Sequence, residues 1–342
     1  MAYNLVFPKE HYPVCLKEYY IYDIFHNDDN QLIIVSPFEK LYKFKIYDEK
    51  NNIVELNTEI CLNKRTYLHY CHMENYMPTI KLIIEENEIE VSVNKYPTYE
   101  NEIVMSTMVY NEDNYIVQWI KYHILLGISR FIIYDNSKAY DGVSYHSIEK
   151  KSNLKTLLVE YIENGTVCLI SWPYFKRLRN SGISGQTTQQ THSINAFKTC
   201  KYIGLFDIDE YVNPQKSFIK INDLFDEIIK ENNIKINDIG GFCILAKLFY
   251  NPSDKPTDGY NFLKIYDCND VTKTVRNKNF VIPKNIKIFN IHNVSIGKKL
   301  FIIDEKLLYF NHYFFLNKQN RGKNITRNID MTIDKITATF CI

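Results

Sequence analysis

Three acidic residues directly follow an apolar run near the middle of the chain. Asp207, Asp209 and Glu210 stand at positions i, i+2 and i+3 after the segment 202–206. Carboxylates this close repel one another unless a cation lies among them. Hard divalent cations take oxygen ligands, and Mg²⁺ is commonly held by one or two carboxylates while phosphate groups fill the other positions. The spacing therefore indicates a site for Mn²⁺ or Mg²⁺ that bridges a diphosphate, with a solvated turn as the alternative.

A metal ion at this position would suit the chemistry of a diphosphate leaving group. Negative charge grows on the diphosphate as its bond breaks, and a bound cation stabilises that charge. Nucleotide sugars carry such a leaving group. A nucleotide-sugar donor is therefore the substrate class that the acidic motif favours.

Two further polar motifs also follow predicted strands. Asn111-Glu112 comes after the apolar run 103–109, and Asp135 comes after the run 130–134. In open α/β sheets, ligands bind beyond the carboxyl ends of the strands. We therefore predict that Asn111, Glu112 and Asp135 bind the substrate. Asp135 would accept hydrogen bonds from the base or the ribose, and a turn-forming role is its alternative.

The elements that would position these motifs alternate between strand and helix from about residue 100 onward. Strands are predicted at 103–109, 130–134, 166–171, 202–206 and 241–248, and helices at 115–126, 144–151, 187–200 and 221–231. The stretch 181–185 consists mostly of glycine and serine and is interpreted as a flexible connector. The alternation is typical of an α/β fold with βαβ units, a mostly parallel, Rossmann-like sheet and helices on both faces.

The segment before this region has a different pattern. Short runs at 31–35, 41–47 and 88–93 have the composition of strands, and clusters of turn-forming residues separate them. We therefore divide the chain into a small β-rich N-terminal module (1–98), a catalytic domain (99–325) and a C-terminal tail (326–342). Nothing in the first segment suggests chemistry.

Composition limits the classes of function. Lysine and arginine number 41 and aspartate and glutamate 40, a net charge of +1 that argues against a protein whose main partner is nucleic acid or an anionic membrane. The sequence has neither a secretory signal pattern nor a run of about 20 apolar residues, so we predict a soluble, cytoplasmic protein without a membrane span. The eight cysteines form no C-x-x-C pair, which does not fit a zinc knuckle.

Several of these motifs resemble those of glycosyltransferase family 92. Residues 111–127 are similar to the family's N-E…E-W-x-x-Y-H-x-x-L-G block, with Gln118 in place of an acidic residue, and residues 207–211 match its D-x-D-E-[FY] motif. Weaker likenesses lie at 131–136, 189–200, 273–276, 291–292 and 311–313. The resemblance covers about residues 100–325.

The resemblance implies a GT-A fold and a metal-dependent transferase that moves a hexose from a UDP-sugar to a glycan or glycoconjugate acceptor. The hexose is most often galactose, and the transfer proceeds with inversion. By this likeness Asp209 is the first metal ligand and Asp207 the second, the latter directly or through the ribose and water. A late histidine, His292 or His312, would complete the site. Each of these histidines ends an apolar stretch, so a role in the core or at the surface is the alternative.

Residues further along the chain complete the implied site. Lys273 and Arg276 would neutralise the diphosphate, since arginine offers a bidentate fork; a solvated basic loop is the alternative. An inverting transfer needs a base that takes the proton of the acceptor hydroxyl. Asp254 and Asp258 are the candidates, with turn formation as their alternative role. Residues 248–254 depart from the family's F-G-S-S-G-H element, which leaves the acceptor open.

Two other functions stay open on the sequence. A non-catalytic carbohydrate-binding or assembly protein could keep the same fold. A sugar nucleotidyltransferase would share the carboxylates at strand ends. However, such enzymes usually carry a glycine-rich loop after the first strand, and residues 108–112 contain no glycine.

Overall fold

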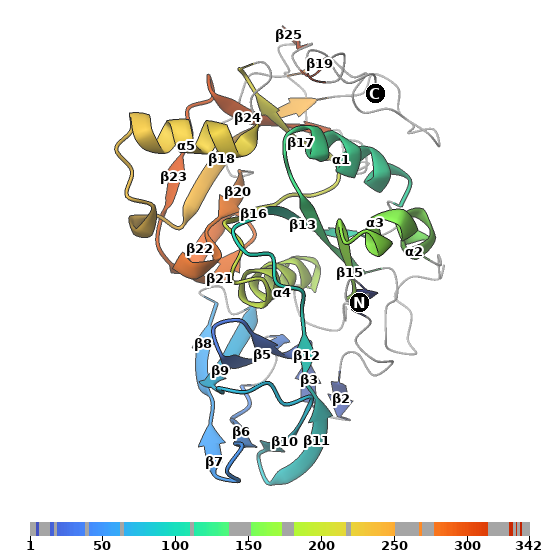
Figure 1. The fold of residues 1–342 in the computed structure, drawn as a ribbon, viewed down its shortest axis with the longest axis vertical. Helices are drawn as coiled ribbons and strands as arrows, with labels where there is room; N and C mark the ends of the chain where they lie inside the picture. The colour runs from blue at the N-terminus through green and yellow to red at the C-terminus, as the bar shows by residue number, and fades with distance from the viewer. Residues whose placement is uncertain are drawn as a thin grey trace.

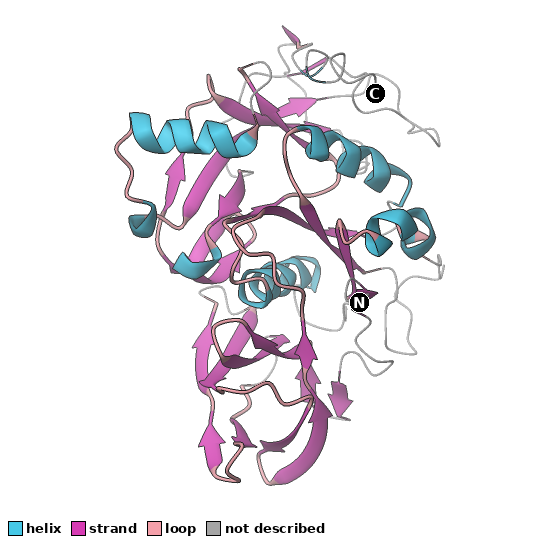
Figure 2. Ribbon diagram, viewed as in Figure 1, coloured by secondary structure: helices cyan, strands magenta, loops and turns pink. Residues whose placement is uncertain are grey.

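Strands from residues 14–95 form one end of the molecule, and an α/β region, which β1 (Leu5–Val6) also joins, forms the other, as the computed structural model shows (Figure 1). The structure describes residues 5–6, 14–16, 19–37, 41–61, 65–109, 113–136, 152–172, 181–216, 220–249, 267–268, 277–313, 328–330, 333 and 336. Within these ranges, every helix belongs to the α/β region (Figure 2). The prediction of a mixed α/β chain is therefore confirmed.

Two small sheets make up most of the N-terminal β region, by which we mean residues 1–98. The five-stranded sheet has the order β12 (Asn94–Lys95), β4 (Asp23–Asn27), β5 (Gln31–Pro37), β9 (Thr66–His72) and β8 (Asn57–Ile60). The four-stranded sheet has the order β11 (Asn87–Ser92), β10 (Thr79–Ile84), β6 (Phe44–Tyr47) and β7 (Ile53–Glu55). Strands β2 (Val14–Leu16) and β3 (Tyr19–Ile21) pair separately. Apolar side chains from both larger sheets, such as Ile34 and Leu82, share one buried core.

A large mixed sheet organises the α/β region. Its order is β1 (Leu5–Val6), β15 (Val167–Ser171), β14 (Arg130–Asp135), β13 (Ile103–Val109), β16 (Tyr202–Leu205), β20 (Lys278–Val281), β18 (Gly241–Phe249), β19 (Asp267–Cys268) and β25 (Asn328–Ile329). The first five strands are parallel, and β20 runs antiparallel to both of its neighbours. Antiparallel strands thus extend a parallel core, and the sheet is less uniformly parallel than the strand–helix alternation predicted.

Two further strands place the acidic motif at the edge of this sheet. β24 (Leu308–Tyr313) pairs in parallel with β18 and antiparallel with β17 (Glu210–Pro214). β18 also pairs with β23 (Leu300–Ile302), and β21 (Ile286–Asn290) forms a hairpin with β22 (Asn293–Gly297). The short segment 206–209 therefore joins the end of β16 to the start of β17.

Helices cover both faces of the large sheet, as predicted. α1 (Asp113–Leu125), α2 (Leu154–Leu157), α3 (Val159–Glu163) and α5 (Ile221–Glu231) bury apolar side chains in one common core on one face. Short 3₁₀ turns occur at Ile236–Asp238 and Pro283–Asn285. The predicted helix at 144–151 lies outside the described residues. None of the described helices is both long enough and apolar enough to cross a membrane.

The opposite face carries α4 (Ser181–Ala196), which lies between the large sheet and the N-terminal β region (Figure 1). The interpretation of residues 181–185 as a connector was wrong, because the helix begins at Ser181. Burial between two sheets favours a helix here over the local preference of glycine and serine. Apolar residues of both regions, including Phe25 and Ile132, share a second core beside this helix.

Candidate metal centre

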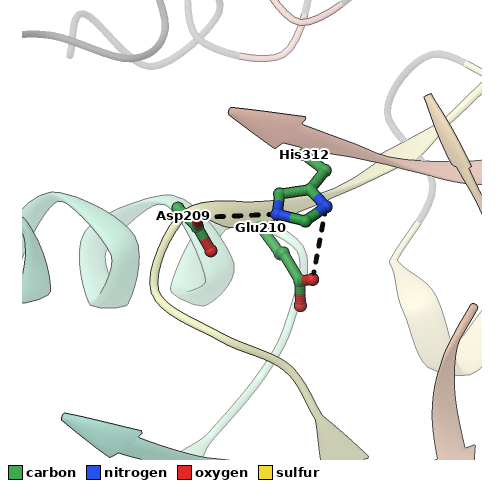
Figure 3. Close-up of side chains that lie close together, drawn as sticks. All are labelled: Asp209, Glu210 and His312. Carbon is green, nitrogen blue, oxygen red and sulfur yellow. Dashed lines mark ion pairs between the residues drawn. The ribbon is translucent and has the colours of Figure 1, made fainter. Parts of the chain in front are cut away.

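Strand register brings three potential ligand residues together. In the antiparallel ladder between β17 and β24, Glu210 lies directly opposite His312. The backbone N–H of Tyr313 also donates to the carbonyl of Asp209 at 2.9 Å, which fixes the residue before β17. Directly opposed residues of a ladder carry their side chains on the same face. As a result, ligand atoms of Asp209, Glu210 and His312 lie within 4.8 Å of one another (Figure 3).

The two nitrogens of His312 face different carboxylates (Figure 3). Nε2 lies 3.5 Å from Oδ2 of Asp209, and Nδ1 lies 3.7 Å from Oε1 of Glu210. Burial lowers the pKa of His312, but Asp209 and then Glu210 oppose this effect, and the pKa ends above its ordinary value. The imidazole therefore lies in a negative field, which is also the field that a divalent cation prefers.

A buried lysine lies beneath these carboxylates. The side chain of Lys278, on β20, is only 2% exposed, and its Nζ lies 2.6 Å from Oδ2 of Asp207 and 2.9 Å from Oε2 of Glu210. Burial would lower its pKa, but the two carboxylates outweigh burial and raise the pKa of Lys278 above its ordinary value. The lysine is therefore charged. It compensates part of the negative charge of the acidic motif from inside the protein.

Glu210 belongs to the interior of the site. Its side chain is 1% exposed, and its Oε2 accepts the backbone N–H of Asp207 at 2.8 Å in addition to the contact with Lys278. Burial raises the pKa of Glu210, and neighbouring Asp207 adds to this effect, while Lys278 opposes it. One oxygen of Glu210 is thus engaged by the protein, and the other faces His312.

Asp207 lies beside the cluster rather than in it. Its Oδ1 accepts a hydrogen bond from Nε2 of Gln186 at 2.9 Å, and its Oδ2 contacts Lys278. The side chain is 41% exposed. Burial raises the pKa of Asp207, but the charge and the hydrogen bond of Lys278, with smaller contributions from His312 and His292, together hold that pKa below its ordinary value. Asp207 is therefore an oriented, ionised carboxylate that solvent can still reach.

The other predicted site residues divide into two groups. Asp135 ends β14, at the same edge of the sheet, and His292 lies in the turn between β21 and β22. His292 contacts the carbonyl of Asn277 through Nδ1 at 2.8 Å and does not belong to the three-residue cluster. The remaining candidates lie outside the described residues: Asn111, Glu112, Asp254, Asp258, Lys273 and Arg276.

The arrangement offers a partly exposed set of hard ligands. Oxygen atoms of Asp209 and Glu210 and a nitrogen of His312 come from strands β17 and β24 and from the residue just before β17. Carboxylate oxygens suit Mg²⁺ and Mn²⁺, and imidazole is an accepted nitrogen ligand of first-row metals. The cluster can therefore hold a divalent cation beside the carboxyl end of a parallel strand, where α/β sheets bind their ligands.

Comparison with known proteins supplies the family. The family model of glycosyltransferase family 92 matches residues 99–341, which is more than half of the chain. The chain belongs to glycosyltransferase family 92. The match includes the cluster Asp209, Glu210 and His312, so the candidate metal centre lies within the family's own region.

Individual family 92 proteins are similar to parts of this chain. One from Arabidopsis thaliana is 30% identical over 135 residues, which is 40% of this chain and 20% of the relative. One from Ricinus communis is 32% identical over 110 residues, 32% of this chain and 16% of the relative. One from Oryza sativa is 21% identical over 223 residues, 62% of this chain and 33% of the relative. The chain therefore spans at most about a third of these relatives' length.

Among solved structures, the chain is similar to a bacterial iron-containing dodecameric glycosyltransferase, TibC from enterotoxigenic E. coli. The sequence identity is 8%, and the overlay covers 52% of this chain and 40% of that one. The TM-score is 0.15. So low a score carries no argument about fold or mechanism.

In this family 92 chain, the motif of helix α1 holds the strand that follows the acidic cluster. Trp119 Nε1 donates to the carbonyl of Glu210 at 2.9 Å, and Tyr122 Oη donates to the carbonyl of Val212 at 2.7 Å. The backbone N–H of Val212 lies 3.3 Å from Nε2 of His123, whose Nδ1 lies 2.8 Å from the carbonyl of Trp119. Burial lowers the pKa of His123 to about 3. The ring is therefore neutral, with Nδ1 as donor and Nε2 as acceptor.

Sequence reasoning missed Lys278 as a residue of the family 92 site. The prediction singled out Lys273 and Arg276, which lie outside the described residues, as the basic partners of the acidic motif. A signal was present, because Lys278 lies just before the apolar run Phe280–Ile282, and the structure buries every residue of the strand Lys278–Val281. A lysine in such a strand is almost never fully buried unless it is paired.

Proposed function

We propose that this chain is a metal-dependent glycosyltransferase that transfers a hexose from a UDP-sugar to a glycan or glycoconjugate acceptor with inversion. Galactose is the first candidate for the hexose. The observation that carries the proposal is the convergence of Asp209, Glu210 and His312 after β16 in a chain of family 92. The four adjacent parallel strands β15, β14, β13 and β16, with helices on both faces, support a GT-A arrangement for residues 99–325.

We assign the metal ligands from the carboxylate that each ring nitrogen of His312 faces. Its Nε2 faces Oδ2 of Asp209, so these two atoms would hold Mn²⁺ or Mg²⁺ between them. Nδ1 faces Glu210, so Glu210 would accept the Nδ1–H and orient the ring, as carboxylates commonly do for metal-bound histidines. When bound, the ion would stabilise the negative charge that grows on the departing diphosphate.

Lys278, Gln186 and Asp207 would prepare the donor side of this site. The buried Lys278 ammonium keeps Asp207 ionised and fixes one of its oxygens. Gln186 fixes the other oxygen. Held in this way and 41% exposed, the Asp207 carboxylate would accept a hydrogen bond from a ribose hydroxyl without first reorienting.

Further roles follow from the sequence and complete the proposal. Asp135 would contact the base or the ribose from the end of β14. Asn111 and Glu112 would bind the donor, and Lys273 and Arg276 would neutralise its diphosphate. Asp254 and Asp258 are the proposed bases for the acceptor hydroxyl. The β-rich residues 1–98 and the tail 326–342 would flank this catalytic domain.

Replacing one proposed metal ligand tests the function. Asp209→Asn keeps the size of the side chain but removes its charge, so UDP binding should lose its dependence on Mn²⁺. Transfer from a UDP-sugar should fall by about 100-fold or more, because a bound metal is worth several kcal/mol to the transition state. Titration calorimetry with UDP, with and without Mn²⁺, measures the first effect. A UDP-sugar turnover assay measures the second.

A matched control separates this site from any exposed carboxylate. Asp238→Asn, in an exposed 3₁₀ turn, should leave both measurements unchanged. Unaltered Mn²⁺-dependent UDP binding in Asp209→Asn would contradict the assignment. If the wild-type chain binds UDP with Mn²⁺ but neither hydrolyses nor transfers any UDP-sugar, a non-catalytic carbohydrate-binding or assembly protein becomes the better conclusion.

A further inference from the structure

A second histidine–carboxylate pair lies away from the metal centre, inside the molecule. His192, on α4, contacts Oδ2 of Asp23 through Nε2 at 2.6 Å, and neither side chain has any exposed surface. On its other side, Nδ1 of His192 lies 2.7 Å from Oη of Tyr134. Asp23 also accepts hydrogen bonds from Nδ2 of Asn94 at 2.8 Å and from Oη of Tyr96.

Aromatic rings enclose the imidazole of His192. Its ring centroid lies 4.8 Å from that of Phe25, 5.0 Å from Tyr96 and 4.9 Å from Trp172. Phe25 and Tyr96 belong to the N-terminal β region, whereas Trp172 directly follows β15 of the large sheet. A fully buried polar group must find its partners inside the protein. The partners of His192 are Asp23 in the N-terminal β region and Tyr134 in the large sheet.

The hydrogen-bond pattern follows from the state of Tyr134. Burial raises the pKa of Tyr134 well above its ordinary value, so its hydroxyl keeps the proton and can donate to Nδ1 of His192. Nε2 then carries the imidazole hydrogen and donates to Asp23. One nitrogen therefore joins α4 to the large sheet, and the other joins it to the N-terminal β region.

The same helix reaches the metal centre at its other end. Gln186 precedes His192 by six residues, which is about 9 Å along a helix axis. Its Nε2 donates to Oδ1 of Asp207 at 2.9 Å, and Nε2 of Gln189 donates to Oγ of Ser106 on β13 at 2.8 Å. Because a helix is stiff over this distance, fixing its rotation at His192 also fixes where Gln186 meets Asp207.

We propose that His192 is a positioning residue for the donor side of the metal centre, acting through α4 and Gln186. The N-terminal β region takes part through Asp23, so it orients the site as well as stabilising the chain. The inference rests on the proposed function, because it concerns the affinity of that site for UDP and its metal ion.

Further contacts also link α4 to the N-terminal β region. Nδ2 of Asn195, also on α4, donates to the carbonyl of Lys287 on β21 at 2.8 Å. Nζ of Lys287 in turn contacts Oε1 of Glu59 in the N-terminal β region at 2.6 Å. The hairpin that carries His292 is thus tied both to α4 and to the N-terminal β region.

A pair of histidine variants tests the proposal. His192→Phe keeps a ring for packing but removes both hydrogen bonds, so the dissociation constant for UDP in the presence of Mn²⁺ should rise about tenfold, as for other groups that orient a metal site. His69→Phe is the control. His69 is equally buried, but its nitrogens contact Ser36 and Thr58 within the N-terminal β region. It should lower Tm and leave UDP affinity unchanged.

A double-variant cycle tells positioning from general destabilisation. If His192 acts through Gln186, adding His192→Phe to Gln186→Ala should cost little further UDP affinity, because the hydrogen bond to Asp207 is already absent. The affinities are measured by calorimetry at a temperature at which every variant is folded. His192→Gln, which keeps a donor for Asp23, replaces His192→Phe if the latter does not fold, and the same direction is expected.

Each outcome decides the inference. Equal UDP affinity in wild type and His192→Phe overturns it, and so do additive losses in the double variant or an equal loss in His69→Phe. Failure of the wild-type chain to bind UDP with Mn²⁺ overturns the proposed function as well. The inference is supported if UDP affinity falls about tenfold in His192→Phe but not in His69→Phe, and if His192→Phe causes little further loss when Gln186→Ala is already present.

Discussion

Two clusters in this chain pair a histidine with carboxylates, and they differ in exposure and in charge balance. Among the residues that the structure describes, the carboxylate paired with His192 is Asp23, and neither side chain has exposed surface. Around His312, three carboxylates belong to one short motif, and the side chains of Asp209 and His312 are 18% and 14% exposed. We call these the closed cluster and the open cluster.

The difference shows what distinguishes a binding site from a buried histidine–carboxylate hydrogen bond. In the closed cluster, Asp23 accepts from His192, Asn94 and Tyr96, so the protein itself supplies its donors. In the open cluster, Lys278 compensates only part of the charge of three carboxylates, and oxygen atoms stay within reach of solvent. The open cluster can therefore gain from an external cation, whereas the closed cluster has nothing to gain from one.

The largest effect is expected from breaking the closed cluster. Asp23→Ala leaves the buried donors of His192, Asn94 and Tyr96 without their acceptor. Leaving a buried donor unsatisfied typically costs about 1–3 kcal/mol, so three such donors together should cost at least about 3 kcal/mol of unfolding free energy. Urea unfolding should show this loss without Mn²⁺, and adding Mn²⁺ should not restore the lost stability. A loss below about 1 kcal/mol, or its recovery by Mn²⁺, would contradict the role of Asp23 as the shared acceptor of these buried donors.

A smaller effect, with a different response to metal, is expected from the open cluster. Lys278→Met leaves Asp207 and Glu210 without their shared cation. The cost should be about 2–3 kcal/mol without metal, because water reaches part of this cluster. Mn²⁺ should then stabilise the variant more than it stabilises the wild type, since the removed ammonium no longer repels the ion.

The measurement for Lys278→Met is the rise in Tm on adding Mn²⁺, compared between variant and wild type. Lys278→Arg keeps the charge and serves as the matched control, with a rise like that of the wild type. The same rise in Lys278→Met and in wild type would show that Lys278 does not share its carboxylates with the metal.

The smallest effect concerns pH and the histidine that supports the open cluster from behind. The pKa of His123 is lowered by burial to about 3, against an unfolded value of 6.5, so below pH 6.5 the unfolded chain binds the extra proton. The stabilising contribution of neutral His123 is therefore complete above pH 6.5 and is lost as pH falls toward 3. At pH 5 the loss amounts to about 2 kcal/mol.

His123→Gln isolates this contribution from other acid effects. Glutamine keeps an amide donor and acceptor but does not titrate. Between pH 7 and pH 5, urea unfolding of the variant should therefore lose about 2 kcal/mol less stability than the wild type does. If the variant and the wild type lost the same unfolding free energy between pH 7 and pH 5, protonation of His123 would not destabilise the folded state.

Much of the α/β region could be predicted because its signals are local. The strand 103–109 and the helix 221–231 were predicted with the bounds that the structure has. An apolar run followed by polar residues already indicates a buried strand and its exposed end. For the same reason, the position of Asp207 and Asp209 just beyond β16 was predictable.

The rest depended on partners far along the chain. Helix α4 has buried polar residues on most of its faces, and this pattern lacks the apolar stripe that marks an ordinary amphipathic helix. Its residues 181–185 therefore gave no helical signal. The pairing of Asp23 with His192 spans 169 residues, and no local pattern in the sequence predicts a contact over that distance.

The sequence by itself determined the chemistry that is available: an acidic motif at a strand end, late histidines, and the α1 block that holds β17. Only the tertiary structure decided which of these groups meet. The register between β17 and β24 places His312 in the cluster. The pairing of β16 with β20 places Lys278 next to Asp207. The physical reason is that periodicity and burial act over a few residues, whereas the field at a carboxylate depends on whichever charges the fold brings within several ångströms.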